Sequence, residues 1–186
     1  MSVTTESIEI ENVVASSDIG QELDLDTLYA DFQGADYNPD NFPGLVYRMD
    51  EPKAAALIFR SGKVVCTGAN SIANVTTALE TVFDELRALG IDVVVSPNIE
   101  VQNIVSSGDL GQALNLNAIA IGLGLERVEY EPEQFPGLVY RLDNPAVVVL
   151  LFGSGKSVVT GGNEPDDAEE ALMKIDARLT DLGLLE

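Results

Sequence analysis

Hydrophobic and polar residues follow the same succession of patterns twice along the 186-residue chain. Residues 8–16 and 99–107 alternate apolar and polar positions and carry β-branched side chains, which is typical of strands. Residues 71–90 and 165–183 instead place apolar residues at the helical period. Each half of the chain is therefore expected to begin with a strand and to end with an amphipathic helix.

Between these elements, each half shows a short helical segment and then further strand-like runs. Asp18 and Asp109 follow the first strands and are expected to cap the short helices. Turn-forming residues separate the later runs and predict hairpins at 50–52, 61–62, 143–145 and 154–155. Each half has the predicted order β-α-β-β-β-β-α, which gives an α+β fold with helices on one face of an antiparallel sheet.

The two halves are also similar residue by residue. Residues 42–90 align with 135–183 at a constant offset of 93 and share 23 identities, while residues 10–25 align with 101–116 at an offset of 91. Two long copies are too few for a solenoid, and they suggest a pseudo-dimer within one chain. The domain limits expected from this repeat are 1–94 and 95–186.

Composition excludes several classes of function. The chain carries 31 acidic and 10 basic residues, for a net charge of −21, and it has no histidine and one cysteine, Cys66. A disulfide framework, a Cys/His zinc site and histidine-based catalysis are therefore excluded. The loop at 153–157 lacks the leading glycine of a Walker motif. We expect no catalytic residue, no cofactor, no metal site and no enzymatic activity.

The chain shows no targeting or membrane signal. The first twelve residues are acidic and lack a basic stretch followed by a long apolar run. No apolar run approaches the roughly 18 residues that a spanning helix needs. A cytoplasmic protein without membrane contact is the expectation.

The central strands are apolar at nearly every position rather than at alternate ones, notably at 54–59 and 146–152. One interpretation is a sheet buried on both faces. The other is that one face stays open for a partner, because large apolar patches on soluble proteins mark binding surfaces. Each half offers one long and one short helix, too few to cover both faces, so the pattern favours the open face.

The placement of charge extends this interpretation. Residues 42–70 carry four basic and two acidic side chains, and residues 135–163 carry two basic side chains and one acidic side chain. Both segments are thus net positive inside a strongly acidic chain. Cations recur at matched positions, as in Lys63 and Lys156. An apolar face bordered by paired cations suits a nucleic-acid groove, which has phosphates at its edges and bases within.

Four motifs in each copy resemble the TATA-box-binding protein family of archaeal type. They are NVV or NIV near the start of each copy, FPGLVYR, LIFRSGK or LLFGSGK, and VCTG or VVTG. The resemblance covers residues from about 8 to 185. It implies a pseudo-twofold saddle with a curved ten-stranded antiparallel sheet, helices on the convex face and a concave face for double-stranded DNA.

By this resemblance, the protein is a general transcription initiation factor that binds and bends TATA-box DNA through the minor groove. It implies recruitment of transcription initiation factor B and, indirectly, RNA polymerase. Residues 131–134 resemble the factor's docking surface and place Glu131 and Glu133 there, whereas Gln134 departs from the leucine usual in the family. The resemblance leaves open whether the free protein forms a homodimer.

The resemblance also assigns DNA-contacting roles. The intercalating side chains are Phe42, Phe59, Phe135 and Phe152. The residues that meet base edges are Asn12, Asn103, Thr67, Thr160, Val14, Val105, Val65, Val158, Leu57 and Leu150. The residues that meet phosphates are Arg48, Lys63, Arg141 and Lys156. An amide donor suits the acceptors that A·T pairs display in the minor groove.

The acidic composition resembles adaptation to molar intracellular salt. We hypothesise that carboxylates near the DNA take up cations, which would oppose the usual loss of affinity as salt rises. An alternative function of a different class remains. In that alternative, the chain is a pseudo-symmetric protein-interaction module whose open apolar face binds a polypeptide or a second subunit.

Overall fold

The protein, as a computed structural model, is described from residue 7 to residue 186 and forms two compact units. The first unit comprises residues 12–102, and the second comprises residues 7–11 and 103–186. The division falls within β1 (Glu9–Asp18) and β6 (Glu100–Asp109), the first strand of each repeat. No helix in the described range is long and apolar enough to cross a membrane.

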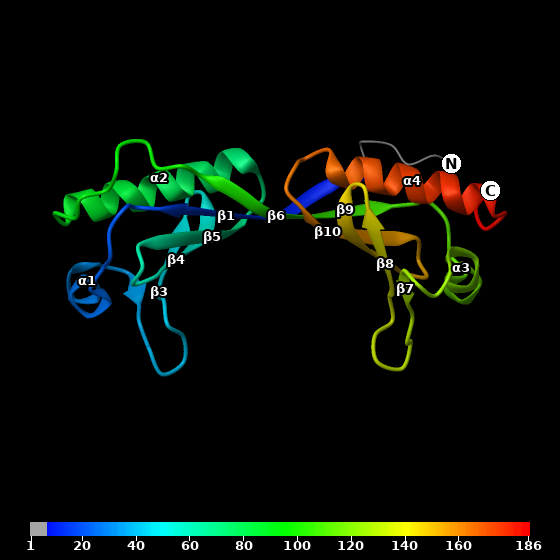
Figure 1. The fold of residues 1–186 in the computed structure, drawn as a ribbon, viewed down its shortest axis with the longest axis horizontal. Helices are drawn as coiled ribbons and strands as arrows, with labels where there is room; N and C mark the ends of the chain where they lie inside the picture. The colour runs from blue at the N-terminus through cyan, green and yellow to red at the C-terminus, as the bar shows by residue number, and fades with distance from the viewer. Residues whose placement is uncertain (1–6) are drawn as a thin grey trace. The chain divides into compact units, whose positions relative to one another are not determined.

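In the first unit, five strands pair antiparallel in the order β2-β3-β4-β5-β1. The elements after β1 are α1 (Leu25–Asp31), β2 (Ala35–Asp36), β3 (Leu45–Asp50), β4 (Lys53–Ile58), β5 (Lys63–Ala69) and α2 (Ile72–Ala88). Helix α2 lies along one face of β4 and β5, as Figure 1 shows. The loop between β2 and β3 extends away from the sheet.

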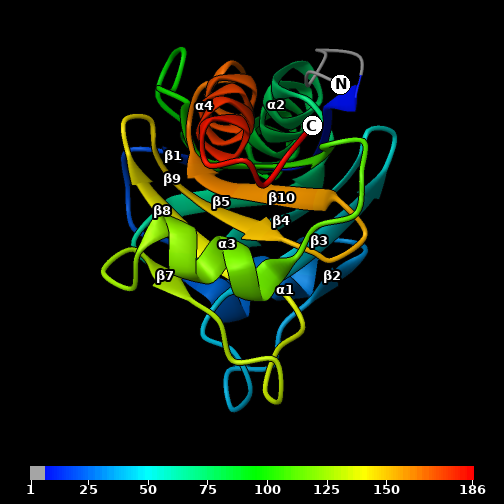
Figure 2. The same cartoon turned by 90° about the vertical axis from the view of Figure 1, so that its right-hand side faces the viewer.

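The second unit repeats this arrangement, with the order β6-β10-β9-β8-β7. After β6 come α3 (Leu116–Leu123), β7 (Val128–Glu129), β8 (Leu138–Asp143), β9 (Ala146–Leu151), β10 (Lys156–Gly162) and α4 (Asp167–Asp181). Figure 2 shows α4 over β9 and β10, with α3 beside β7. The predicted α+β class and the order β-α-β-β-β-β-α are confirmed in both repeats.

The expected caps of the short helices are wrong. β1 and β6 continue through Asp18 and Asp109, whose carboxylates accept hydrogen bonds from backbone N–H groups two residues later. The helices begin several residues further on. Asp24 caps α1 by accepting a bond from the Thr27 N–H (3.3 Å), and Asn115 caps α3 in the same way. Both positions carry residues that favour turns as well as caps, so the local signal did not separate the two roles.

The long helices bury one stripe of side chains against one face of each sheet. In α2 the buried residues are Val75, Ala78, Leu79, Val82, Phe83 and Leu86. In α4 they are Ala168, Ala171, Leu172, Ile175 and Leu179. Successive side chains of a strand point to opposite faces of the sheet. Every second strand residue therefore points toward a helix, and the residues between them lie on the opposite face. That opposite face is the setting of the candidate site.

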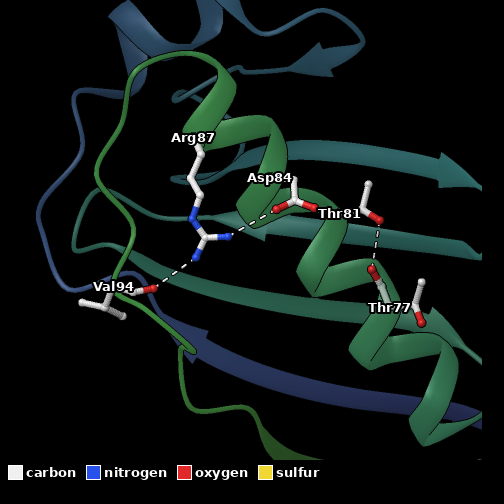
Figure 3. A network of polar contacts seen from close by, with 5 residues as sticks. All are labelled: Thr77, Thr81, Asp84, Arg87 and Val94. Atoms are coloured by element: carbon white, nitrogen blue, oxygen red, sulfur yellow. Dashed lines mark hydrogen bonds and ion pairs between the residues drawn. The ribbon is translucent and has the colours of Figure 1, made fainter.

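The segment that joins the repeats is held against the first unit. The Arg87 guanidinium on α2 donates to Asp84 Oδ1 (3.3 Å) and to the Val94 carbonyl (3.1 Å), as Figure 3 shows. The Val94 N–H in turn donates to the Ile19 carbonyl (3.1 Å). Ser17 Oγ donates to the carbonyl of Asn98 (2.6 Å). These contacts fix residues 91–98 beside α2 and β1.

Candidate nucleic-acid interface

The two faces of each sheet differ in exposure. On β4, Ala54, Ala56 and Ile58 are buried, whereas Ala55 and Leu57 between them are only half-buried. We call the half-buried side the open face of a unit. In the first unit it carries Asn12, Val14, Val46, Ala55, Leu57, Phe59, Val65 and Thr67. In the second unit it carries Asn103, Val105, Val139, Val148, Leu150, Phe152, Val158 and Thr160.

The interpretation of a sheet buried on both faces is therefore wrong. Helices α2 and α4 cover one face of their sheets, and the open-face side chains of both units retain solvent exposure. Cross-strand neighbours on this face are apolar, as where Val46 faces Leu57 and Leu57 faces Val65. The structure thus places the predicted valines and leucines together on one surface in each unit. It adds Val46 and Ala55, with Val139 and Val148, which the sequence analysis did not single out.

Each unit presents a pair of phenylalanines at the end of its open face. Phe42 precedes β3 and Phe59 follows β4, and their ring centroids lie 5.8 Å apart at 64°. Phe135 and Phe152 form the corresponding pair, 5.9 Å apart at 71°. Phe42 is 37% exposed and Phe135 is 39% exposed. The rings are therefore held edge to face at the surface rather than sealed in a core.

Two glycines that the sequence analysis gave no role make these pairs possible. A Cβ on Gly44 would lie 2.8 Å from Phe42 Cε1 and 3.1 Å from Phe59 Cε1. On Gly137 it would lie 2.7 Å and 3.0 Å from the same atoms of Phe135 and Phe152. Side chains do not approach this closely, so only glycine lets both rings pack on the backbone. The repeated FPG motif was the signal that could have indicated this.

The amide of Asn12 has a fixed orientation. Its Oδ1 accepts a hydrogen bond from the Gly68 backbone N–H (2.7 Å), which can only donate. The Nδ2 group therefore faces away from the backbone, 3.3 Å from Thr67 Oγ1. Gly68 has φ 90° beside a register shift in the β1–β5 pairing, and this bulge makes its N–H available. The result is an oriented amide donor on the open face.

The second unit repeats this geometry. Asn103 Oδ1 accepts from the Gly161 N–H (2.6 Å), and Asn103 Nδ2 lies 3.2 Å from Thr160 Oγ1. The structure therefore brings each predicted asparagine and threonine together. Gly68 and Gly161 are the last residues of the VxTG motif, and the sequence alone did not indicate a role for this glycine.

Each predicted phosphate-contacting cation has a carboxylate on a neighbouring strand. Arg48 forms an ion pair with Asp36 (3.1 Å), and Arg141 forms one with Glu129 (3.6 Å). The two lysines also have an acidic residue on the paired strand, since Lys63 lies opposite Asp18 and Lys156 lies opposite Asp109. All four cations are exposed. The edges of the open faces therefore carry charges of both signs.

The second unit has a further ion pair at the end of β8, which the first unit lacks. Arg127 contacts Asp143 at 2.5 Å, and this contact lowers the pKa of the Asp143 carboxyl through the hydrogen bond and the charge of the guanidinium. In the first unit, Gly34 occupies the position that aligns with Arg127. Among residues 7–186, no group of three metal-ligating side chains gathers in one place.

The predicted partner-binding residues lie in the loop between β7 and β8. Glu131 and Glu133 are exposed, and the Glu131 carbonyl accepts hydrogen bonds from the N–H groups of Gln134 and Phe135 (both 3.0 Å). This turn fixes the loop directly before the phenylalanine pair. The loop is thus ordered by its own backbone and presents its acidic side chains to solvent.

Comparison with known proteins gives a consistent result. Residues 7–89 and 98–182 match the family described as transcription factor TFIID, or TATA-binding protein. The chain belongs to the TATA-binding protein family. It is 69% identical, over the full length of both chains, to TATA-box-binding protein B of Halobacterium salinarum. It is also 69% identical to the TATA-box-binding protein of Natronomonas pharaonis, over 97% of each chain.

Among solved structures, the fold resembles that of the TATA-binding protein of Methanococcus jannaschii. The TM-score is 0.84 at 51% identity, over 94% of this chain and 99% of that one. The likeness confirms the predicted fold and the resemblance to the archaeal family, and the two curated relatives come from halophilic archaea. TATA-binding proteins are transcription factors and not enzymes, which confirms the expectation of a non-enzymatic protein.

The single cysteine, Cys66, does not reach the protein surface. Its side chain is fully buried on β5, and burial raises the pKa of its thiol to about 11. A neutral thiol in an apolar setting acts as a small hydrophobic side chain.

Proposed function

We propose that this chain is a general transcription initiation factor that binds and bends TATA-box promoter DNA through the minor groove, in the cytoplasm. The open face is the observation that carries the proposal. In each unit it combines an apolar floor, an oriented amide donor and an exposed aromatic pair. We assign one half of the DNA site to each open face.

The chemistry of the A·T minor groove fits this surface. A·T pairs display only the acceptors adenine N3 and thymine O2 there, whereas G·C pairs add the guanine N2 amine as a projecting donor. The Nδ2 groups of Asn12 and Asn103 supply donors for the acceptors. The valines and leucines beside them offer no acceptor for the guanine amine, so they disfavour G·C pairs.

The phenylalanine pairs supply the means of bending. Apolar side chains that enter a base step from the minor groove unstack it and kink the duplex toward the major groove. Phe42 and Phe135 are partly exposed, and each packs edge to face against its partner, Phe59 or Phe152. Such pre-positioned rings enter a base step without first having to leave a core.

Recruitment of transcription initiation factor B, and through it RNA polymerase, is part of the same proposal. The loop before Phe135 carries Glu131 and Glu133, where the aligned loop of the first unit carries Asn38 and Asp40. The second loop is thus the more acidic of two otherwise similar turns. A partner with basic residues at its docking surface would distinguish the two units on this basis.

The alternative function is a protein-interaction module that uses the open face, with a homodimer as one form of it. The apolar character of that face favours this alternative, since it suits a polypeptide as well as a groove. The oriented amide donors and the paired cations favour DNA, because an apolar partner would leave those donors unpaired at a cost.

A binding titration separates the two functions. Fluorescence anisotropy in molar KCl compares a TATA duplex with a G·C-rich duplex of equal length. We expect the wild type to prefer the TATA duplex and the Phe59→Ala/Phe152→Ala variant to bind it at least about tenfold more weakly, or ~1.4 kcal/mol. Tyr29→Ala is the matched control, because Tyr29 is an exposed aromatic on α1 outside the open face. Equal binding to both duplexes would contradict the proposal and favour the alternative.

A further inference from the structure

The open faces of the two units differ at one position within an otherwise identical row of side chains. In the first unit, Arg48 lies opposite Ala55, and Ala55 lies opposite Thr67, which contacts Asn12. In the second unit, the corresponding row is Arg141, Val148, Thr160 and Asn103. Three of the four residues are the same in both rows. Only alanine 55 and valine 148 differ.

Both differing side chains lie on the open face. Ala55 is half-buried between the buried Ala54 and Ala56, and Val148 is half-buried between two buried valines. Each stands between an amide donor for base edges and a cation for the phosphate backbone. A base pair that meets this row in the first unit therefore finds a methyl group, where the second unit presents a larger isopropyl group.

We propose that this difference sets the orientation of the protein on DNA by making the first unit the more tolerant of a G·C pair. The inference rests on the proposed function. The guanine N2 amine is the one group that projects from the minor-groove floor. Ala55 leaves space beside this amine, whereas Val148 occupies that space and presents only carbon to the amine. A site with one G·C pair is bound with the first unit over the half that contains it.

The two repeats also differ at two further positions on these faces, and neither difference sets the orientation on DNA. Ile10 in the first repeat aligns with Val101, and both are half-buried apolar side chains that differ by one methyl group. Lys53 aligns with Ala146, and Lys53 is exposed at the start of β4 opposite Asp50. A cation of this kind meets phosphates, which position a protein without reading sequence. Lys53 therefore contributes affinity, and the Ile10 and Val101 pair provides a matched control.

The test reads orientation directly from DNA cleavage. An iron chelate is attached to Ser154→Cys, in the exposed turn between β9 and β10, and the label stays selective because Cys66 is buried. Two duplexes share an A·T core and carry one G·C pair, in one half or in the mirror position. The wild type should cleave mainly at the end away from the G·C pair, by at least about fivefold, the lower limit for one mismatched pair. The same label at Ser61→Cys, in the first unit, should cut at the opposite end.

The exchange variant Ala55→Val/Val148→Ala should reverse the cleavage pattern on both duplexes. The control exchange Ile10→Val/Val101→Ile should leave it unchanged. An exchange variant that binds with the wild-type orientation would overturn the inference, as would a wild type without orientation preference. Should the double variant fail to fold, Ala55→Val alone gives both units a valine and should abolish the preference, and a retained preference would overturn the inference. A wild type that binds neither duplex would contradict the proposed function itself.

Discussion

Gly44 and Gly137 lie directly beneath the exposed phenylalanine pairs, and at the residue scale they show how the backbone prepares the site. A side chain at either position would enter the space of two aromatic rings. Gly68 and Gly161 act in a different way, because their N–H groups fix the asparagine amides. The site thus depends on glycines that themselves offer DNA no functional group.

Gly137→Ala is expected to weaken DNA binding by about tenfold while the protein remains folded, since the added methyl group displaces Phe135 and Phe152 from their pairing. Gly153→Ala is the matched control, because a Cβ there would meet only the Leu114 carbonyl oxygen at 3.9 Å. Anisotropy titrations with a TATA duplex and thermal unfolding measure the two effects. Unchanged binding of Gly137→Ala would show that the ring pair does not contribute.

Cys66 gives a prediction about pH. The pKa of its buried thiol is raised to about 11, so the thiol stays neutral in the folded protein where the unfolded thiol ionises, above its ordinary value of 9.0. The contribution of Cys66 to folding stability is therefore fully present below pH 9.0, and it is lost as the pH rises from 9.0 toward about 11. At pH 8, a disulfide reagent should leave the native protein unlabelled and label it fully in urea. Rapid labelling of the native protein would show that Cys66 is accessible.

The sequence could predict most of the side chains on the open face, although not Ala55 or Val148, and it did not indicate how they are held. Alternation along the strands and the repeated asparagines and threonines identify positions on one face. The hydrogen bond from Gly68 depends on a bulge in the pairing of β1 with β5, which are far apart in the chain. The ion pair of Arg48 with Asp36 depends in the same way on strand pairing.

At the scale of elements, helix and hairpin patterns predicted α2, α4 and the central strands with ends close to those observed. The short helices were located correctly, but their starts were not. Asp18 and Asp24 are both acceptors that suit a cap, and only the continuation of β1 shows which one serves α1. Local residue preferences cannot decide between such neighbours when the pairing of a distant strand determines where the first element ends.

Arg87 tests how the segment at 91–98 is held. Its guanidinium donates to Asp84 and to the Val94 carbonyl, so Arg87→Ala removes one link between α2 and this segment. We expect faster amide hydrogen exchange in residues 91–98 and a loss of stability of about 1 kcal/mol or less, because the bonds are exposed. Lys174→Ala on α4, which also removes an exposed ion pair, is the control and should leave that segment unchanged. Unaltered exchange in Arg87→Ala would show that other contacts hold the segment.

At the scale of the whole molecule, the net charge of −21 coexists with two surfaces proposed for a polyanion. Each phosphate that a protein neutralises normally contributes about −0.9 to the slope of log affinity against log salt. Arg48 and Arg141 form ion pairs with Asp36 and Glu129. If the two arginines turn to phosphates, as proposed, the freed carboxylates would take up cations from solution. Cation uptake opposes the release of counterions from DNA.

The affinity for a TATA duplex should therefore hold or rise between roughly 0.1 and 2 M KCl, whereas counterion release alone would lower it. The Asp36→Asn/Glu129→Gln variant removes two of the carboxylates and should lose affinity more steeply as salt rises. A titration series in KCl measures both slopes. A steep loss of wild-type affinity would contradict this account of the acidic edges.

Readout of the minor groove by the open faces can be measured with a duplex that contains inosine·cytosine pairs. Inosine lacks the N2 amine, so such a duplex matches A·T pairs in the minor groove and G·C pairs in the major groove. Because the open faces meet only the minor groove, the inosine duplex should bind within about threefold of the TATA duplex, a difference of ~0.7 kcal/mol. Binding as weak as that of the matching G·C duplex would contradict it.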